Sequence, residues 1–441
     1  MGSRRENAGN LLNPLGNPLH LLNTTFMHFV QELSLTAPVV VWAATAVLLA
    51  SALLSLWLLL QRRGLRTTLL VALGVVASVV AVRWCIEDLW RPFPDAIPWQ
   101  IYAGAGVCFV AIAALCLARK RVLLVLALAL SLLSTLIVGN NVYQLYPTIG
   151  SVVNNEHAKK MQWDEFQAAL KTKTLPQDQG VHISLPLDSP QSGFKARTAQ
   201  IYLPPAYWRS DTALPVVVMM AGNPGRPEDW FGAGMADRAA DQYQQAHGGV
   251  APIIASVDAT GSYTANPGCT DSPGSNVATY LAKDVPEQLK KKLNVDPDQQ
   301  HWTIGGLSYG GTCALQIATN EPQAYGNFLD FSGEWEPNIG SHEQTVNKLF
   351  EGSEEKFKAH NPADLLQAHE HDGRYRHLSG LFIAGDRDKQ AVHDLQALQQ
   401  RAAAAGINSQ FRTVKGGHDF GTWRTAFEQS LPWAAKQGGL G

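Results

Sequence analysis

The sequence predicts a chain of two unlike parts: four transmembrane helices, then an α/β domain with a mostly parallel sheet and helices on both faces. Two observations predict this arrangement. Four long, nearly uncharged apolar runs lie within the first 140 residues, and after them short β-rich runs alternate with amphipathic stretches. Charge divides the chain in the same way. Residues 1–139 hold ten Lys and Arg against five Asp and Glu, whereas residues 140–441 hold 25 against 32.

Composition excludes several classes of protein. A hydrophobic content of 46% with 9% aromatic residues is typical of packed cores and excludes a disordered chain. No long basic stripe is present to neutralise phosphates, so nucleic acid is not an expected partner. Five cysteines in 441 residues exclude a scaffold held together by disulfides.

The four apolar runs are each close to the about 17–25 residues that cross a bilayer core. They are Pro38–Leu60, Leu65–Val82, Trp99–Ala118 and Val122–Gly139. Four buried core helices are the alternative, but they would need a very large soluble core within a hundred residues. We therefore expect four spanning helices, with the lipid bilayer as a partner.

Basic residues set the expected orientation of these helices. Arginine and lysine fill two short loops, residues 61–66 and 119–121, whereas the loop between them mixes both signs of charge. Basic loops stay on the cytoplasmic side. The chain is thus expected to be a multi-pass protein of the cell membrane with everything after Gly139 extracytoplasmic. The anchor is expected only to hold and orient the outer domain.

Four segments follow from this division. Residues 1–36 form an N-terminal segment, with Leu19–Leu33 expected on the membrane surface as an amphipathic helix. Residues 37–140 form the four-helix anchor, and 141–176 a linker with a lead-in helix. Residues 177–441 form the outer domain.

Strands and helices alternate through the outer domain, as a parallel sheet requires. Expected strands are 199–204, 215–221, 252–258, 302–306, 327–332, 380–385 and 410–414. Expected helices are Gly232–His247, Val277–Leu293, Tyr309–Asn320, Val392–Ala405 and Trp423–Lys436. In such sheets chemistry gathers at the carboxyl ends of the strands.

Ser308 is the expected nucleophile. It lies in Gly306-Leu307-Ser308-Tyr309-Gly310, a G-x-S-x-G motif between an expected strand and an expected helix. That setting is the strand–turn–helix of a nucleophile elbow, in which flanking glycines let the backbones pass. A glycine-rich turn with a structural serine is the alternative.

His418 is the expected base, because it directly follows the last expected strand and precedes the last helix. Serine needs such a base, which a carboxylate orients in turn. Other histidines between the serine and the C-terminus lie in polar segments. They are His360, His369, His371, His377 and His393.

Asp388 is the favoured acid, since it lies in the turn after the strand 380–385, with room to reach the histidine. Asp386 in the same turn is the near rival, and its other role would be to bond its own backbone. Glu334 and Glu336 are more distant alternatives. The run His369-Glu370-His371-Asp372 suggests a metal site, but no further ligands have suitable spacing, so we expect a solvated helix end.

An oxyanion hole would complete an acyl-transfer site. The amide of Tyr309, at the start of the helix after the serine, is one candidate donor. The amide of Asn223, after the strand 215–221, is the other, because Pro224 has no amide hydrogen. Trp230, which follows this loop, is expected to contact the substrate. An oxidising compartment permits a Cys269–Cys313 disulfide, with two buried thiols as the alternative.

With these pieces in place, the outer domain resembles the esterase-D type of α/β-hydrolase, the group of S-formylglutathione hydrolases, enterochelin esterases and bacterial mycolyltransferases. The resemblance extends over 199–424 and rests on AQIYLPPAYW, VVVMMAGNPG, WTIGGLSYGG, FIAGDRD and GGHDFGTW. It implies an α/β-hydrolase fold with a Ser308–Asp388–His418 triad and no metal or organic cofactor. The family commonly has His-Gly or Asp-Gly where this chain has Ala221-Gly222.

The sequence therefore predicts a membrane-anchored serine esterase that faces outward and hydrolyses an ester of a cell-envelope lipid or a wall-linked acyl group. Tethering favours an amphiphilic substrate. One alternative is a mycolyltransferase-like acyltransferase, which shares all these residues. Another is a non-catalytic envelope module on a hydrolase scaffold. Oligomeric state is not predicted.

Overall fold

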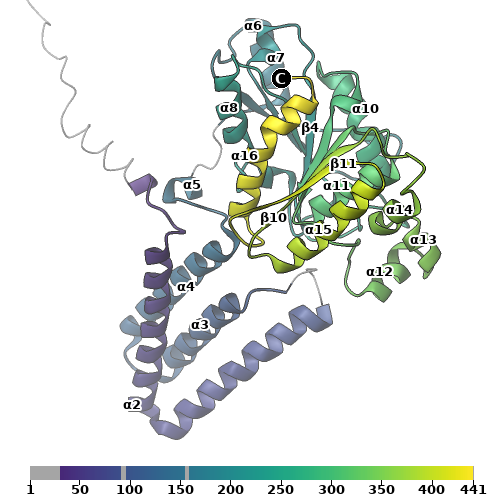
Figure 1. Cartoon of the computed structure of the whole chain (residues 1–441). Coiled ribbons are helices and arrows are strands. Elements are labelled where there is room, and N and C mark those ends of the chain that lie inside the picture. Colours follow the sequence, from purple (N-terminus) through teal and green to yellow (C-terminus); the bar gives the residue numbers. More distant parts are fainter. Residues whose placement is uncertain (1–29, 91–95, 154–157, 441) are drawn as a thin grey trace, which may run out of the picture.

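The computed structural model describes residues 30–90, 96–153 and 158–440. The expected surface helix Leu19–Leu33 lies almost wholly outside the described residues. Figure 1 shows an α/β body above a group of apolar helices, and the C-terminus lies at the far end of the body from these helices.

Three helices in the described part are long and apolar enough to cross a membrane. They are α2 (Pro38–Trp84), which continues into a π-helical turn (Cys85–Trp90), α3 (Trp99–Leu117) and α4 (Arg121–Tyr143). The first two predicted runs both lie in α2, which consists of two helices that meet at a kink at Gly64, without the longer loop expected between them.

The cause is the sequence of the expected first loop. Arginine, glutamine and leucine around position 64 favour helix, so only Gly64 leaves the helical region, with φ 79° and ψ 173°. Figure 1 shows α2 reversing direction at this bend, so that it forms two arms. The second basic turn lies beside it, since Arg63 Nε donates to the carbonyl of Leu117 over 3.0 Å.

Within the described residues, nine strands form one sheet in the order β1-β2-β3-β5-β4-β8-β9-β10-β11. Strand β3 is antiparallel to both neighbours, and every other pair is parallel, which confirms the predicted mostly parallel sheet. The strands are β1 (Lys159–Gln162), β2 (Val181–Leu185), β3 (Ala199–Leu203), β4 (Val216–Met220), β5 (Ile253–Val257), β8 (Thr303–Leu307), β9 (Asn327–Phe331), β10 (Ser379–Gly385) and β11 (Asn408–Val414).

The seven predicted strands are present, and β1 and β2 were missed. β1 lies in the segment interpreted as a linker, and three of its four residues are exposed, so it carries no apolar signal. β2 is short, and the polar His182 interrupts its apolar pattern. A short hairpin, β6 (Asp271–Ser272) and β7 (Ser275–Asn276), stands apart from the main sheet.

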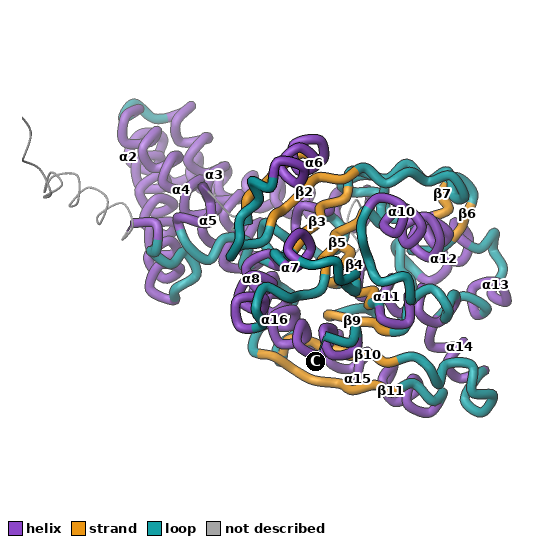
Figure 2. Tube along the Cα trace, turned by 90° about the horizontal axis from the view of Figure 1, so that it is seen from above, coloured by secondary structure: helices purple, strands orange, loops and turns teal. Residues whose placement is uncertain are grey.

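Helices cover both faces of the sheet (Figure 2). α8 and α16 pack on the face that carries Val217 and Met219. α10, α11 and α15 pack on the face that carries Val218 and Met220. The helices of the body are α5 (Ile149–Val153), α6 (Trp163–Thr172), α7 (Ala206–Arg209), α8 (Ala236–Ala246), α9 (Val277–Thr279), α10 (Val285–Lys292), α11 (Tyr309–Asn320), α12 (His342–Leu349), α13 (Glu354–Lys358), α14 (Pro362–Ala368), α15 (Lys389–Ala404) and α16 (Phe420–Gln437).

Candidate active site

The turn between β8 and α11 carries Ser308 in a strained conformation. Its φ of 51° and ψ of −119° lie outside the regions that side-chain-bearing residues prefer, at a cost of about 1–3 kcal/mol. Close packing enforces the turn. A Cβ on Gly306 would lie 2.4 Å from the backbone of Gly310, and a Cβ on Gly310 would lie 2.3 Å from the carbonyl oxygen of Met220.

The loop between β11 and α16 brings His418 to this serine. Its Nε2 lies 3.0 Å from Ser308 Oγ, and its Nδ1 lies 2.7 Å from Asp388 Oδ2. Because an ionised carboxylate only accepts, Nδ1 carries the proton and Nε2 is left to accept the serine hydrogen. The edge-to-face contact with Trp423, at 5.0 Å between ring centroids, supports this orientation.

The two carboxylate oxygens of Asp388 make different contacts. It is the N-cap of α15, where Oδ1 accepts from the amide of Ala391 over 3.3 Å, and its other oxygen meets His418. The rival Asp386 turns elsewhere, because Lys415 donates to it over 2.6 Å and the amide of Gly416 over 3.2 Å. Lys415 holds the pKa of Asp386 below its ordinary value.

The more distant alternatives, Glu334 and Glu336, both line the cavity, described below, that His418 lines. Glu336 accepts from His342 over 3.0 Å. The other histidines have local partners: carbonyl oxygens for His360 and His377, and neighbouring carboxylates for His369, His371 and His393.

Both expected oxyanion donors adjoin the serine. Tyr309 is the first residue of α11, so its amide has no carbonyl one turn earlier to bond. Gly222 packs against the elbow, where a Cβ would lie 2.8 Å from Leu307 and 3.5 Å from the Cβ of Ser308. Asn223 is the next residue and lines the same cavity as Ser308, and its side-chain amide donates to the carbonyl of Ala265 over 2.8 Å.

The structure corrects the role expected for Trp230. Its side chain is fully buried, bonds the carbonyl of Met220 over 2.9 Å through its indole nitrogen, and packs against Phe331 and Phe427. It braces the oxyanion loop from behind and does not line the cavity.

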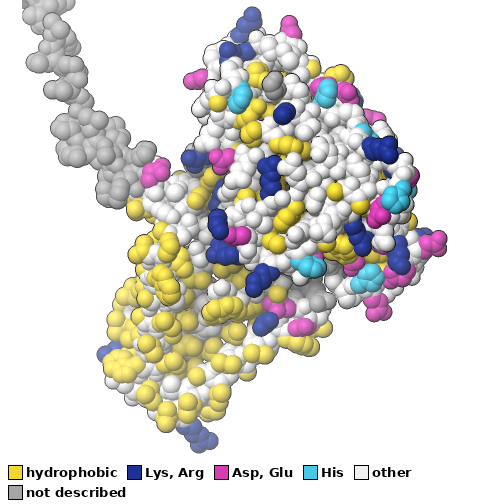
Figure 3. Space-filling view, viewed as in Figure 1, with side chains coloured by type: hydrophobic (Ala, Val, Ile, Leu, Met, Phe, Trp, Pro, Cys, Tyr) yellow, Lys and Arg dark blue, Asp and Glu magenta, His cyan; other side chains and the backbone are white. Residues whose placement is uncertain are grey.

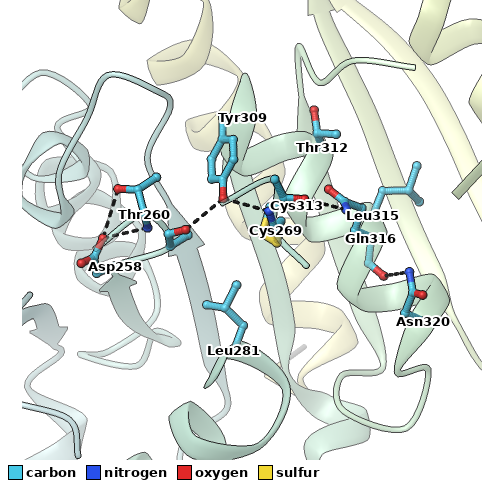
Figure 4. The surroundings of a disulfide bond; sticks show 12 residues. Asp258, Thr260, Cys269, Leu281, Tyr309, Thr312, Cys313, Leu315, Gln316 and Asn320 are labelled. Carbon is cyan, nitrogen blue, oxygen red and sulfur yellow. Dashed lines mark hydrogen bonds between the residues drawn. A yellow bond between two sulfur atoms is a disulfide. The ribbon is translucent and has the colours of Figure 1, made fainter. Parts of the chain in front are cut away.

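A disulfide joins Cys269 to Cys313, with 5.3 Å between the Cα atoms (Figure 4). It ties the loop after β5 to the nucleophile helix. Tyr309 reinforces the same link, because its hydroxyl accepts from the amide of Cys269 over 3.1 Å and donates to the carbonyl of Ala259 over 2.9 Å.

Ser308, Asp388 and His418 all line a cavity of about 1010 Å³. One part of its wall was missed by sequence reasoning, because it comes from the apolar helices. These residues are Ala96, Ile97, Pro98, Ile101, Val142, Tyr143 and Leu145. Another part of the wall carries polar side chains, including Glu334, Glu336, Asn338, Gln390 and Asp394.

Sequence reasoning also missed Asp330, a carboxyl group within the buried strand β9. Oδ1 accepts from the amide of Gly333 over 2.9 Å, whereas Oδ2 has no hydrogen-bond partner. Complete burial raises the pKa of Asp330 to about 7. An aspartate inside the otherwise apolar run NFLDF was the available signal. Its position beside Gly311 places it directly beneath the nucleophile helix.

The fold and the site together define an α/β-hydrolase of the serine type. Residues 194–434 match the family described as "Putative esterase", and the protein belongs to this family. The predicted membership of the esterase group is thereby confirmed, and with it a hydrolase enzyme.

The chain is also similar to individual proteins, two of which are described as esterases. An uncharacterized protein of Corynebacterium glutamicum is 47% identical over 365 residues, which are 80% of this chain and 86% of the relative. The iron(III) salmochelin esterase of Escherichia coli O6:H1 is 27% identical over 154 residues, 33% of this chain and 35% of the relative. A solved ferulic acid esterase is similar in fold, with a TM-score of 0.51 and 22% identity over 59% of this chain and 98% of that chain.

Proposed function

We propose that the protein is a membrane-anchored, extracytoplasmic serine esterase that acts on an ester of the cell envelope. Ser308 is the nucleophile, His418 the base, and Asp388 holds the imidazole in the required tautomer. One observation carries the proposal: an unbroken hydrogen-bonded chain from Asp388 through His418 to Ser308, with distances of 2.7 and 3.0 Å, opens into a large cavity.

The reaction follows from these contacts. His418 Nε2 takes the hydroxyl proton as Ser308 Oγ bonds to the ester carbonyl carbon, and the carbonyl oxygen takes up the negative charge. The amides of Tyr309 and Asn223 stabilise that charge. The imidazolium then gives its proton to the departing alcohol. Water, deprotonated by the same histidine, releases the acid and restores Ser308.

The orientation of the catalytic domain is supported by the positions of the basic residues. Arg62, Arg63 and Arg66 lie at the bend of α2, and Arg63 contacts the end of α3, where the second basic turn begins. Lys and Arg side chains lie at the lower tip of the apolar region, away from the α/β body (Figure 3). Basic ends face the cytoplasm, and this pattern supports a body that faces outward, where a Cys269–Cys313 disulfide would be stable.

Acyl transfer to an alcohol is the second candidate. The polar part of the cavity wall, with Glu334, Asn338 and Gln390, offers partners for the hydroxyl groups of an acceptor. In that reaction the acceptor replaces water in the second half. Product analysis with and without an added alcohol separates the two reactions.

The test uses a fluorophosphonate probe on cells that carry the wild type or Ser308→Ala. We expect labelling of the wild type alone, and labelling by a membrane-impermeant probe if the body faces outward. Failure of the folded wild type to react would overturn the catalytic proposal.

A further inference from the structure

We propose that the cavity takes the acyl chain of an ester-linked bilayer lipid, and that α3 and α4 supply the wall against which the chain lies. This inference rests on the proposed function of Ser308 and names the substrate class of that site. It assigns the apolar helices a part in substrate selection.

The chemistry of the wall fits an acyl chain. Ile97, Pro98 and Ile101 line the cavity at the start of α3, and Val142 and Leu145 line it at the end of α4. None of these side chains carries a charge or a hydrogen-bonding group. A chain lying here would cover this apolar wall and remove it from water. The volume of about 1010 Å³ is at the upper end of ordinary ligand pockets.

The position of the wall points to the bilayer as the source. α3 has 19 residues and is about 28 Å long, which matches the hydrocarbon core, so its first turn lies at one edge of that core. Trp84, Trp90 and Trp99 are all more than half exposed near the ends of the helices on the side of the body. Tryptophan is enriched at this level of a membrane. Lipid ester groups lie at the same boundary.

The wall is fixed relative to the triad. Arg424 on α16 donates to the carbonyl of Gln144, just after α4, over 2.9 Å and to the carbonyl of Ala233 over 2.6 Å. Burial lowers the pKa of this arginine to about 10. Because α16 begins two residues after His418, the end of α4 and the catalytic histidine are held by the same helix. Phe420, in the first turn of α16, lines the cavity between them.

Two esters and two variants test the inference with the full chain in lipid nanodiscs. The esters are p-nitrophenyl butyrate, which reacts from water, and p-nitrophenyl dodecanoate, which partitions into the bilayer. Ile101→Trp fills the cavity wall. Leu136→Trp is the matched control, since Leu136 lies on α4 but is 71% exposed, away from the cavity.

We expect Ile101→Trp to lower the ratio of dodecanoate to butyrate hydrolysis at least about tenfold, as steric exclusion from an apolar pocket does. Leu136→Trp should leave the ratio unchanged. Ile101→Ala removes contacts instead and should lower the same ratio several-fold. Fluorophosphonate labelling of Ser308 in each variant reports that the site is folded.

The outcomes separate the two proposals. Hydrolysis of butyrate that depends on Ser308, together with an unchanged ratio in both Ile101 variants, would overturn the lipid-wall inference and leave the esterase standing. An equal fall for both esters with labelling intact would also overturn it. Absence of any hydrolysis or labelling that depends on Ser308 would overturn the esterase and the inference together.

Discussion

The buried carboxyl group of Asp330 makes stability depend on pH in a direction that can be worked out from the structure. In the folded protein burial raises its pKa from 3.8 to about 7. Between those values the unfolded chain has lost this proton and the folded chain has kept it. The stabilisation is therefore complete below the unfolded pKa and is lost as pH rises through the folded pKa.

The size of this effect follows from the shift. Each pKa unit corresponds to about 1.4 kcal/mol, so the whole loss is about 4 kcal/mol, of which roughly 3 kcal/mol falls between about pH 5 and pH 8. For a domain of this size that is a change of about 8 °C in the unfolding midpoint. Asp330→Asn keeps an acceptor for the amide of Gly333 but cannot ionise. We expect the variant to lack this fall.

The assay is thermal unfolding of the full chain in detergent over that pH range, followed by the fluorescence of buried tryptophans such as Trp302. Subtracting the unfolding midpoint of Asp330→Asn from that of the wild type at each pH isolates the titration of Asp330 from that of all other groups. Asp386→Asn is the control: Lys415 lowers the pKa of Asp386, so this group stays ionised above about pH 5 and its removal leaves the slope unchanged. Parallel pH curves for wild type and Asp330→Asn would refute the reasoning.

Two further predictions concern the frame around the nucleophile. Gly310→Ala would place a methyl group 2.3 Å from the carbonyl oxygen of Met220, so we expect loss of folded protein in a yield and unfolding assay. Gly139→Ala, with no atom within 4 Å, should be tolerated. Replacing Cys269 and Cys313 together by serine opens a link across 44 residues and should cost roughly 4 kcal/mol, measured as a lower unfolding midpoint; an unchanged midpoint would contradict a structural role.

The serine and histidine that the structure brings into contact could be selected from the sequence because their signals are local. Ser308 is flanked by the glycines of the elbow, and His418 directly follows a strand, so position in the chain was enough to nominate both. The choice between Asp386 and Asp388 was different. Both lie in one turn and differ in their partners: Asp388 meets His418, whereas Asp386 accepts from Lys415, 29 residues away in the chain.

The direction in which a side chain points was the main feature that could not be predicted from the sequence. Trp230 follows the oxyanion loop, and its place in the chain suggested a substrate contact. The adjacent aromatic rings of Phe331 and Phe427 come from β9 and α16, so the pocket that buries Trp230 is assembled from distant segments. Hydropathy likewise located the two apolar arms of α2, but it did not show that a single non-helical residue, Gly64, is enough to turn the chain between them.

The contacts made by the ends of the apolar helices could not be predicted from the hydropathy pattern. An apolar run indicates that a segment can enter a membrane, and it contains nothing about what its ends contact. Here α4 ends at Tyr143, which lines the cavity beside Ser308, and Arg424 donates to the carbonyl of the next residue, Gln144. The ends of α3 and α4 therefore line the same cavity as Ser308 and His418. The apolar helices, expected only to hold and orient the body, thus also form one wall of the cavity that holds the proposed triad.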